Sequence, residues 1–310
     1  TDGKSALLIA CEYLRMNIAE TLVNIDEIEC DDASDDGKTP LCYACEKGSE
    51  YLVSHLIDHY ANVNQHTKDN RTPLYFACLS RNSIIIQNIL SKIDNNSQIN
   101  LKEETNGTTP LLIACSNGDL SSFNLLINEV DENSDLNYKD NSGRSLLFAA
   151  CEGENSEIVD VLLTKFNVDS NIANNEGKTC LHVACEKKNT EIVYLILNHS
   201  SNQVNLNNKW NNATALEIAC EKGSIEIVQL LIKQEGIQVN QTNKNEVPPL
   251  LCACEIWRAD IIKLLLNEVP DINIDVPHSD GRTALHYACE KGDVEISDFI
   301  LSRSTKSISL

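Results

Sequence analysis

The sequence predicts an all-α fold, a solenoid of about nine stacked helix-turn-helix repeats joined by short β-hairpin loops. Three observations predict it. A single motif recurs along the whole chain at a period of about 35 residues. One cysteine stands at the same place in every copy of that motif. The apolar residues within and between the motifs fall at helical spacing.

The repeated motif is clearest at residues 37–48, which read Gly-Lys-Thr-Pro-Leu-Cys-Tyr-Ala-Cys-Glu-Lys-Gly, and it returns at residues 177–187 and 281–292. Its third position is Ser or Thr in eight of nine copies. These positions are Ser5, Thr39, Thr72, Thr109, Ser145, Thr179, Thr214, Pro248 and Thr283. Because the period runs from end to end, we expect a single domain over residues 1–310. Its repeats should begin near residues 3, 37, 70, 107, 143, 177, 212, 246 and 281.

Each repeat should begin with a short helix, because a Ser or Thr hydroxyl at an N-cap accepts from an unpaired N–H of the first turn. Pro follows in four copies, and the first turn of a helix tolerates its missing N–H. These prolines are Pro40, Pro73, Pro110 and Pro249. Leu and Ala come next at helical spacing and should face the core. A glycine stands where the helix should end in four copies. These glycines are Gly48, Gly118, Gly223 and Gly292.

A second amphipathic helix follows in each repeat, as at residues 226–232, which read Glu-Ile-Val-Gln-Leu-Leu-Ile. A β-branched stretch with Asn comes next, such as Val63-Asn64, and a polar turn closes the unit. Such a unit cannot bury its apolar face alone, so the units must stack. Units three and four are longer, and we expect their loops near Asn95–Asn100 and Glu129–Asp135 to bulge from the stack.

The Gly-x-Thr-Pro-Leu-x-x-Ala motif, the Glu-Ile-Val-x-Leu-Leu helix and the Val-Asn hairpin resemble the ankyrin repeat over essentially residues 1–303. Repeats six and nine keep the family's Leu-His pair, at His182 and His286. Two features depart from the family pattern. Cys replaces the second Ala of the first helix, and the Gly-Ala-Asp segment before the hairpin is mostly lost. The resemblance implies a protein partner bound on the concave face, by hairpin tips and exposed residues of the first helices.

Nine of the 13 cysteines share one register, directly after Ala, and this pattern predicts small buried hydrophobes. They are Cys11, Cys45, Cys78, Cys115, Cys151, Cys185, Cys220, Cys254 and Cys289. Neighbouring helices lie about 8–10 Å apart, whereas a disulfide needs Cα atoms about 5.5–6 Å apart. Zinc is the weaker alternative, because Cys42-Tyr43-Ala44-Cys45 has no second Cys-x-x-Cys at zinc-ribbon spacing. Free thiols favour a reducing compartment, so we expect a cytoplasmic protein.

Charge and motif content argue against several functions. The formal net charge of −21 repels phosphate backbones, which disfavours nucleic acid as a partner and favours a basic protein. No apolar run reaches the roughly 20 residues of a membrane-spanning helix. No phosphate loop, dinucleotide glycine motif, nucleophile elbow or kinase signature occurs. We therefore expect a monomeric scaffold, adaptor or inhibitor with no enzymatic activity, cofactor or metal.

Comparison of the copies separates repeated from variable surface positions. Glu follows the register cysteine in seven of nine copies and should form an acidic column along the stack. Duplication of a polar helix end explains the column as well as a basic ligand does. The variable positions include Trp210, at a hairpin tip, and Trp257 with Arg258, which replace the usual glycine turn. Exposed Trp and Arg are frequent interface hot spots, and packing of each Trp on its own repeat is the alternative.

The sequence thus predicts a binding patch across repeats six to eight. It combines residues around the hairpin glycine with the two that follow the register cysteine and with the two Trp sites. The candidate residues are Asn175, Glu176, Lys178, Glu186, Lys187, Trp210, Asn211, Glu221, Lys222, Lys244, Asn245, Glu255, Trp257 and Arg258.

Two rival functions stay open, a targeting segment of a larger enzyme and a self-assembling structural protein. The chain opens inside a repeat at Thr1, and neither terminal repeat has a distinctly polar outer face of the kind that caps natural stacks. We therefore expect a fragment of a longer chain.

Overall fold

The computed structural model describes residues 4–25, 28–93, 101–130, 135–198, 203–243 and 245–303. Within these ranges the chain forms eighteen α-helices, two per repeat, and isolated antiparallel β-bridges at three hairpins in place of strands. The predicted all-α repeat solenoid is confirmed. The chain divides into two compact units, residues 1–158 and 159–310, with the boundary inside one helix, and each unit is described by itself.

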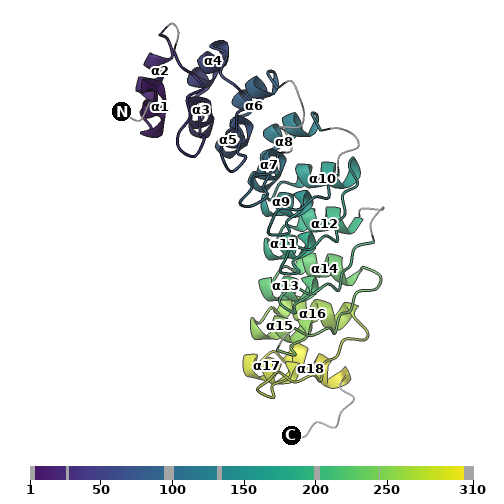
Figure 1. Cartoon of the computed structure of the whole chain (residues 1–310). Coiled ribbons are helices and arrows are strands. Elements are labelled where there is room, and N and C mark those ends of the chain that lie inside the picture. The colour runs from purple at the N-terminus through teal and green to yellow at the C-terminus, as the bar shows by residue number, and fades with distance from the viewer. Residues whose placement is uncertain are drawn as a thin grey trace. The chain divides into compact units, whose positions relative to one another are not determined.

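In the first unit, the first helices of successive repeats form one row and the second helices form another (Figure 1). The first helix of each of repeats one to four packs against the second helix of its own repeat and against the first helix of the next repeat. The helices are α1 (Ala6–Glu12), α2 (Met16–Leu22), α3 (Pro40–Lys47), α4 (Glu50–Asp58), α5 (Pro73–Ser80), α6 (Ser83–Leu90), α7 (Pro110–Asn117), α8 (Leu120–Ile127) and α9 (Leu146–Glu152).

The second unit has the same two-row arrangement, with α11, α13, α15 and α17 in the row of first helices (Figure 1). Helix α10 (Ser156–Thr164) contains the boundary between the units. The other helices are α11 (Cys180–Glu186), α12 (Thr190–Asn198), α13 (Ala215–Lys222), α14 (Ile225–Ile232), α15 (Pro249–Glu255), α16 (Ala259–Glu268), α17 (Ala284–Lys291) and α18 (Val294–Arg303).

The predicted N-caps are confirmed in all eight repeats that carry Ser or Thr. In six of them the hydroxyl accepts from the backbone N–H three residues later, as in Thr39 with Cys42. In repeats six and nine the Leu-His pair has a defined role, because the histidine at N3 completes a capping box with Thr179 or Thr283. Pro248, the one exception, makes no side-chain cap.

The turn after each first helix uses a left-handed residue, three positions beyond the register cysteine. Glycine occupies it in the four repeats predicted, at φ 62–72°. The other five repeats place a side chain there, at Leu14, Arg81, Glu154, Lys188 and Trp257, with φ 52–57°. The turn is therefore kept in every repeat, and only its residue type varies.

Twelve of the 13 cysteines are buried and all 13 are free thiols, as their register predicts for helix packing. Burial raises the pKa of the Cys11 thiol to about 12. Cys289 is the exception, because its side chain is exposed in the last repeat. The prediction that every register cysteine is buried is therefore wrong at Cys289, where no further helix of the described residues packs against that face of α17.

Asparagines in the loops after the second helices join neighbouring repeats of the second unit. Asn240 Nδ2 donates to Asp271 O at 2.7 Å, and Asn240 Oδ1 accepts from the Asn273 N–H at 2.8 Å. The same two bonds join Asn171 to Gln203 and Asn205, and Asn207 to Gly236 and Gln238. This ladder gives the Asn of the repeat a structural role. The loop expected to bulge at Asn95–Asn100 lies outside the described residues, as does most of the one at Glu129–Asp135.

Candidate functional site

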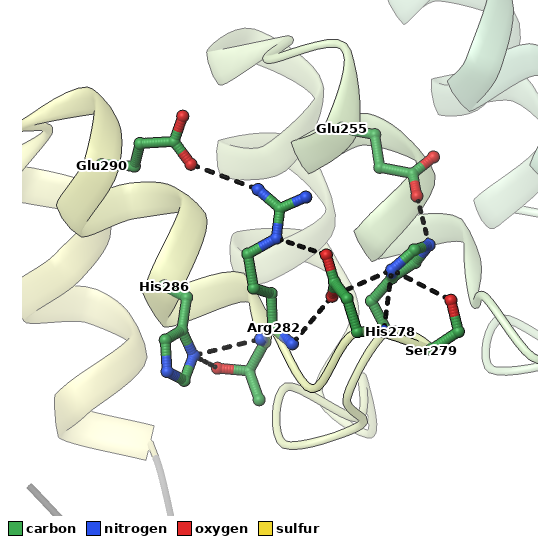
Figure 2. Close-up of polar contacts among 8 residues, drawn as sticks. Glu255, His278, Ser279, Arg282, His286 and Glu290 are labelled. Atoms are coloured by element: carbon green, nitrogen blue, oxygen red, sulfur yellow. Dashed lines mark hydrogen bonds and ion pairs between the residues drawn. The ribbon is translucent and has the colours of Figure 1, made fainter.

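In five repeats, a basic residue at the hairpin neutralises the glutamate that follows the register cysteine. The Lys or Arg directly after the hairpin glycine forms an ion pair with the Glu eight residues later. Figure 2 shows one such pair, in which Arg282 Nη1 lies 3.3 Å from Glu290 Oε2. The other pairs are Lys4–Glu12, Lys38–Glu46, Arg144–Glu152 and Lys178–Glu186. In these repeats each glutamate of the expected acidic column is paired with a cation of the chain itself.

Repeats seven and eight keep the glutamate but lack the basic residue, because Ala213 and Val247 occupy its position. Glu221, in repeat seven, is exposed and forms no ion pair with any residue that the structure describes. Glu255, in repeat eight, lies 2.9 Å from the imidazole Nε2 of His278, a residue of the next hairpin (Figure 2). The acidic character of the column is therefore concentrated at these two repeats.

A hollow of about 400 Å³ opens at the same two repeats. Helices α11, α13 and α15 and the hairpin loops before α13 and α15 form its walls. Its lining residues are Glu186, Trp210, Asn211, Ala213, Ile218, Glu221, Lys222, Asn243, Asn245, Cys252 and Glu255. The floor is apolar, because Ile218 and Cys252 are only 4% and 6% exposed, and the rim carries three carboxylates and one ammonium group. We call this feature the repeat-seven hollow.

Trp210 forms one wall of the hollow and is held from two sides. Its backbone makes an antiparallel bridge with Ala213, with both N···O distances 2.9 Å. Lys178 Nζ lies 4.0 Å from the centre of its ring, so the cation of repeat six stacks on the indole of repeat seven. The indole Nε1 is buried and has no hydrogen-bond partner among the described residues. The ring therefore packs on the preceding repeat while one edge lines the hollow.

His182 sets the position of the hairpin that carries Trp210. Its Nδ1 accepts from the Thr179 N–H at 3.1 Å, and its Nε2 donates to Asn208 O at 3.0 Å. Both contacts require a neutral imidazole with its proton on Nε2. Burial lowers the pKa of His182 to about 4, which keeps the ring neutral at pH 7.

A buried carboxylate, Glu217, lies behind the floor of the hollow. Its Oε2 accepts from the Thr214 N–H, and its Oε1 has no hydrogen-bond partner among the described residues. Burial raises the pKa of this carboxyl. The pKa of the Cys252 thiol is raised, mainly by burial and then by the negative charges of three carboxylates. These carboxylates belong to Glu217, Glu255 and Glu221, and all three therefore lie around this floor residue. The hollow is thus a site of negative potential with an unsatisfied acceptor behind it.

The structure brings together half of the candidate residues predicted from the sequence. Seven of the fourteen line the repeat-seven hollow, namely Glu186, Trp210, Asn211, Glu221, Lys222, Asn245 and Glu255. Lys178 adjoins them through Trp210. Asn175, Glu176 and Lys187 are exposed on repeat six but do not line the hollow. Lys244 lies outside the described residues.

Trp257 and Arg258 lie beside the hollow and serve the turn between helices. Trp257 takes the left-handed position at φ 52° and is half-buried. Arg258 pairs with Asp260 at 2.8 Å and donates from Nη1 to the carbonyl of Gly223. A Cβ at residue 223 would overlap this guanidinium, so Arg258 would have to move to accommodate it. Arg258 therefore has structural partners and Trp257 takes the place of a turn glycine, whereas Trp210 lines the hollow.

Sequence reasoning missed the residues that give the hollow its shape and charge. Ala213, Ile218, Asn243 and Cys252 line it but were not candidates. The sequence could have identified Ala213. Five repeats carry a Lys or Arg eight residues before the glutamate that follows the register cysteine, and repeat seven carries Ala213 at that position. Among the described residues no group of three or more His, Cys, Asp or Glu side chains is placed to hold a metal. None of the described helices is both long and apolar enough to cross a membrane.

Comparison with known proteins agrees with the repeat architecture. A family profile described as Ankyrin repeats (3 copies) matches residues 7–103, 85–174, 147–243 and 235–309, which together cover nearly the whole chain. A search of curated proteins gave no significant match.

Proposed function

The chain belongs to the ankyrin-repeat family, and we propose that it is a non-catalytic module that binds another protein at the repeat-seven hollow. Ankyrin repeats are generally protein–protein interaction modules, and fold alone does not select a partner. The partner would lie on the concave face, across the hairpin loops and first helices of repeats six to eight. A scaffold, adaptor or inhibitor would each use such a surface.

The observation that supports this location is the break in the internal charge pairing. Five repeats neutralise their surface glutamate within the chain, and repeats seven and eight lack the residue that does so. The hollow, the half-buried Trp210 and the exposed Glu221 coincide there. Trp is enriched among interface hot spots, and complementary charge guides a partner to its site. One surface of the second unit thus combines shape, aromatic area and charge.

All 13 cysteines are free thiols, and this supports a reducing intracellular location, because disulfides are common in proteins of oxidising compartments and rare in the cytosol. We propose a cytoplasmic location on this basis, and we propose separately that the chain is a monomer. Light scattering of the purified chain at rising concentration tests the oligomeric state, and a mass that grows with concentration contradicts a monomer.

The binding proposal can be tested without a known partner. Peptides from a random library displayed on phage are selected on the full chain, and the dissociation constant of the best peptide is measured on variants. We expect Trp210→Ala to weaken binding at least about tenfold, because hot-spot Trp truncations cost about 2 kcal/mol or more. The matched control is Tyr194→Ala, an exposed aromatic (53%) on the second-helix row of the same unit.

Trp257→Ala measures how far the patch extends along repeat eight, since Trp257 flanks the hollow without lining it. Equal affinities for the wild type, Trp210→Ala and Trp257→Ala would contradict the proposed location. A urea midpoint near that of the wild type is required of each variant, because Trp210 also packs on Lys178.

A further inference from the structure

We infer that the repeat-seven hollow receives an arginine or lysine side chain of the bound protein, which pairs with Glu221 in place of the cation that this repeat lacks. The inference rests on the proposed function and adds the chemistry of the residue recognised. It also names Ala213, a position that sequence reasoning did not select, as the residue that leaves the site open.

In repeat six, a cation of the chain itself already occupies the place beside the glutamate that is open in repeat seven. There Lys178 pairs with Glu186 and lies 4.0 Å from the centre of the Trp210 ring. Repeat seven has the glutamate but only the methyl group of Ala213 at the equivalent basic position. A cation from outside the chain can therefore occupy, on Glu221, the place that Lys178 takes on Glu186.

The side chains that line the hollow carry more negative than positive charge. The groups that face it are Glu186, Glu221, Glu255 and Lys222, and Glu186 is already compensated by Lys178. Glu217, buried behind the floor, adds a carboxyl oxygen that lacks a donor. Of the two remaining lining carboxylates, Glu255 lies beside His278, and Glu221 forms no ion pair with any residue that the structure describes, so the local potential at Glu221 favours a cation.

The hollow combines apolar walls with a carboxylate at its rim, and a long basic side chain matches both. The floor residues Ile218 and Cys252 and the ring of Trp210 offer apolar surface to the methylene groups of Lys or Arg. The carboxylate of Glu221 is exposed at the rim, where a charged head would meet it. A neutral apolar side chain would satisfy the floor and leave the carboxylates uncompensated.

The test uses peptides selected from the displayed random library on the full 310-residue chain. We expect the selected peptides to carry Arg or Lys at a shared position. Changing that residue to norleucine should weaken binding about tenfold or more, the effect of removing one partner of a charge pair in a partly buried interface. Glu221→Gln should produce the same loss, and the two changes together should cost little more than either alone.

Two further variants sharpen the result. Ala213→Lys installs the missing cation, as in repeat six, and should weaken the peptide at least about tenfold without removing any wall. Glu290→Gln is the matched control, because Glu290 already pairs with Arg282 (Figure 2), and it should leave affinity within about twofold.

The outcomes separate the inference from the proposed function. Peptides without a basic residue, or peptides that bind wild type, Glu221→Gln and Ala213→Lys equally, overturn the inference. The proposed function stands if those peptides still depend on Trp210. Peptides that are indifferent to Trp210→Ala as well contradict both.

Discussion

Lys188 follows helix α11 in a left-handed backbone conformation, at φ 57°, and its replacement by glycine should stabilise the second unit. The residue is exposed and stands three positions after Cys185. The equivalent positions of repeats seven and nine are Gly223 and Gly292, at φ 72° and 69°. The comparison between repeats thus identifies Lys188 as a side chain held where the fold favours glycine.

The magnitude follows from two opposing terms. A non-glycine residue in the left-handed region costs roughly 1–2 kcal/mol, which Lys188→Gly would recover. Glycine loses about 0.5–1 kcal/mol more chain entropy on folding. The net gain in the free energy of unfolding is therefore between about 0 and 1.5 kcal/mol, with a midpoint of about 0.75 kcal/mol. Little packing is lost, because the side chain is exposed.

Urea denaturation followed by circular dichroism measures this difference, with the slope compared between variants. Lys188→Ala is the matched control, because it removes the same side chain but keeps a Cβ in the left-handed conformation. Gly48→Ala is the reverse change, at φ 70°, where an added Cβ would meet only Ser80 Cβ at 3.8 Å. It should destabilise by about 1 kcal/mol. If Lys188→Gly is no more stable than Lys188→Ala, the conformational argument is refuted.

Three further predictions concern the hydrogen bonds and thiols. Asn240→Ala removes the bonds to Asp271 and Asn273 and should lower the free energy of unfolding by about 1 kcal/mol in urea; an unchanged midpoint would show that the ladder adds no stability. The pKa of His182 is depressed from 6.5 to about 4, so its contribution to stability is complete above pH 6.5 and is lost as pH falls towards 4. His182→Gln should flatten the stability profile across that window, and a profile identical to wild type would contradict the neutral assignment. A thiol reagent added to the native protein should label Cys289 rapidly and the other cysteines slowly, because only Cys289 is exposed; rapid labelling of several cysteines would contradict the described core.

The repeat pattern predicted most of the fold because it consists of local signals. A hydroxyl at Thr39, a proline at position 40 and a glycine at position 48 each act within one helix, so the sequence could place that helix closely. The register cysteines were also interpretable, since one small residue per repeat implies packing between neighbours. Cys289 differs because its burial depends on what lies beyond its repeat, which a motif does not show.

The site was harder to predict because it depends on contacts between repeats. Trp210 was visible as an anomaly, but its contact with Lys178 joins two repeats. Trp257 was an equal anomaly in the sequence, and its left-handed backbone shows that it replaces a turn glycine. The five pairs of a basic residue with the glutamate eight residues later could have been recognised by comparing the repeats in the sequence. They give Ala213 its importance, and comparing copies for a missing residue would have found it.

The most direct test of the central claim is hydrogen–deuterium exchange of the full chain with and without the selected peptide. We expect added protection in residues 209–222 and 243–255, which contain most of the residues that line the repeat-seven hollow, and a loss of that protection in Trp210→Ala. Protection confined to the second-helix row, such as residues 190–198, or to repeats of the first unit would contradict it.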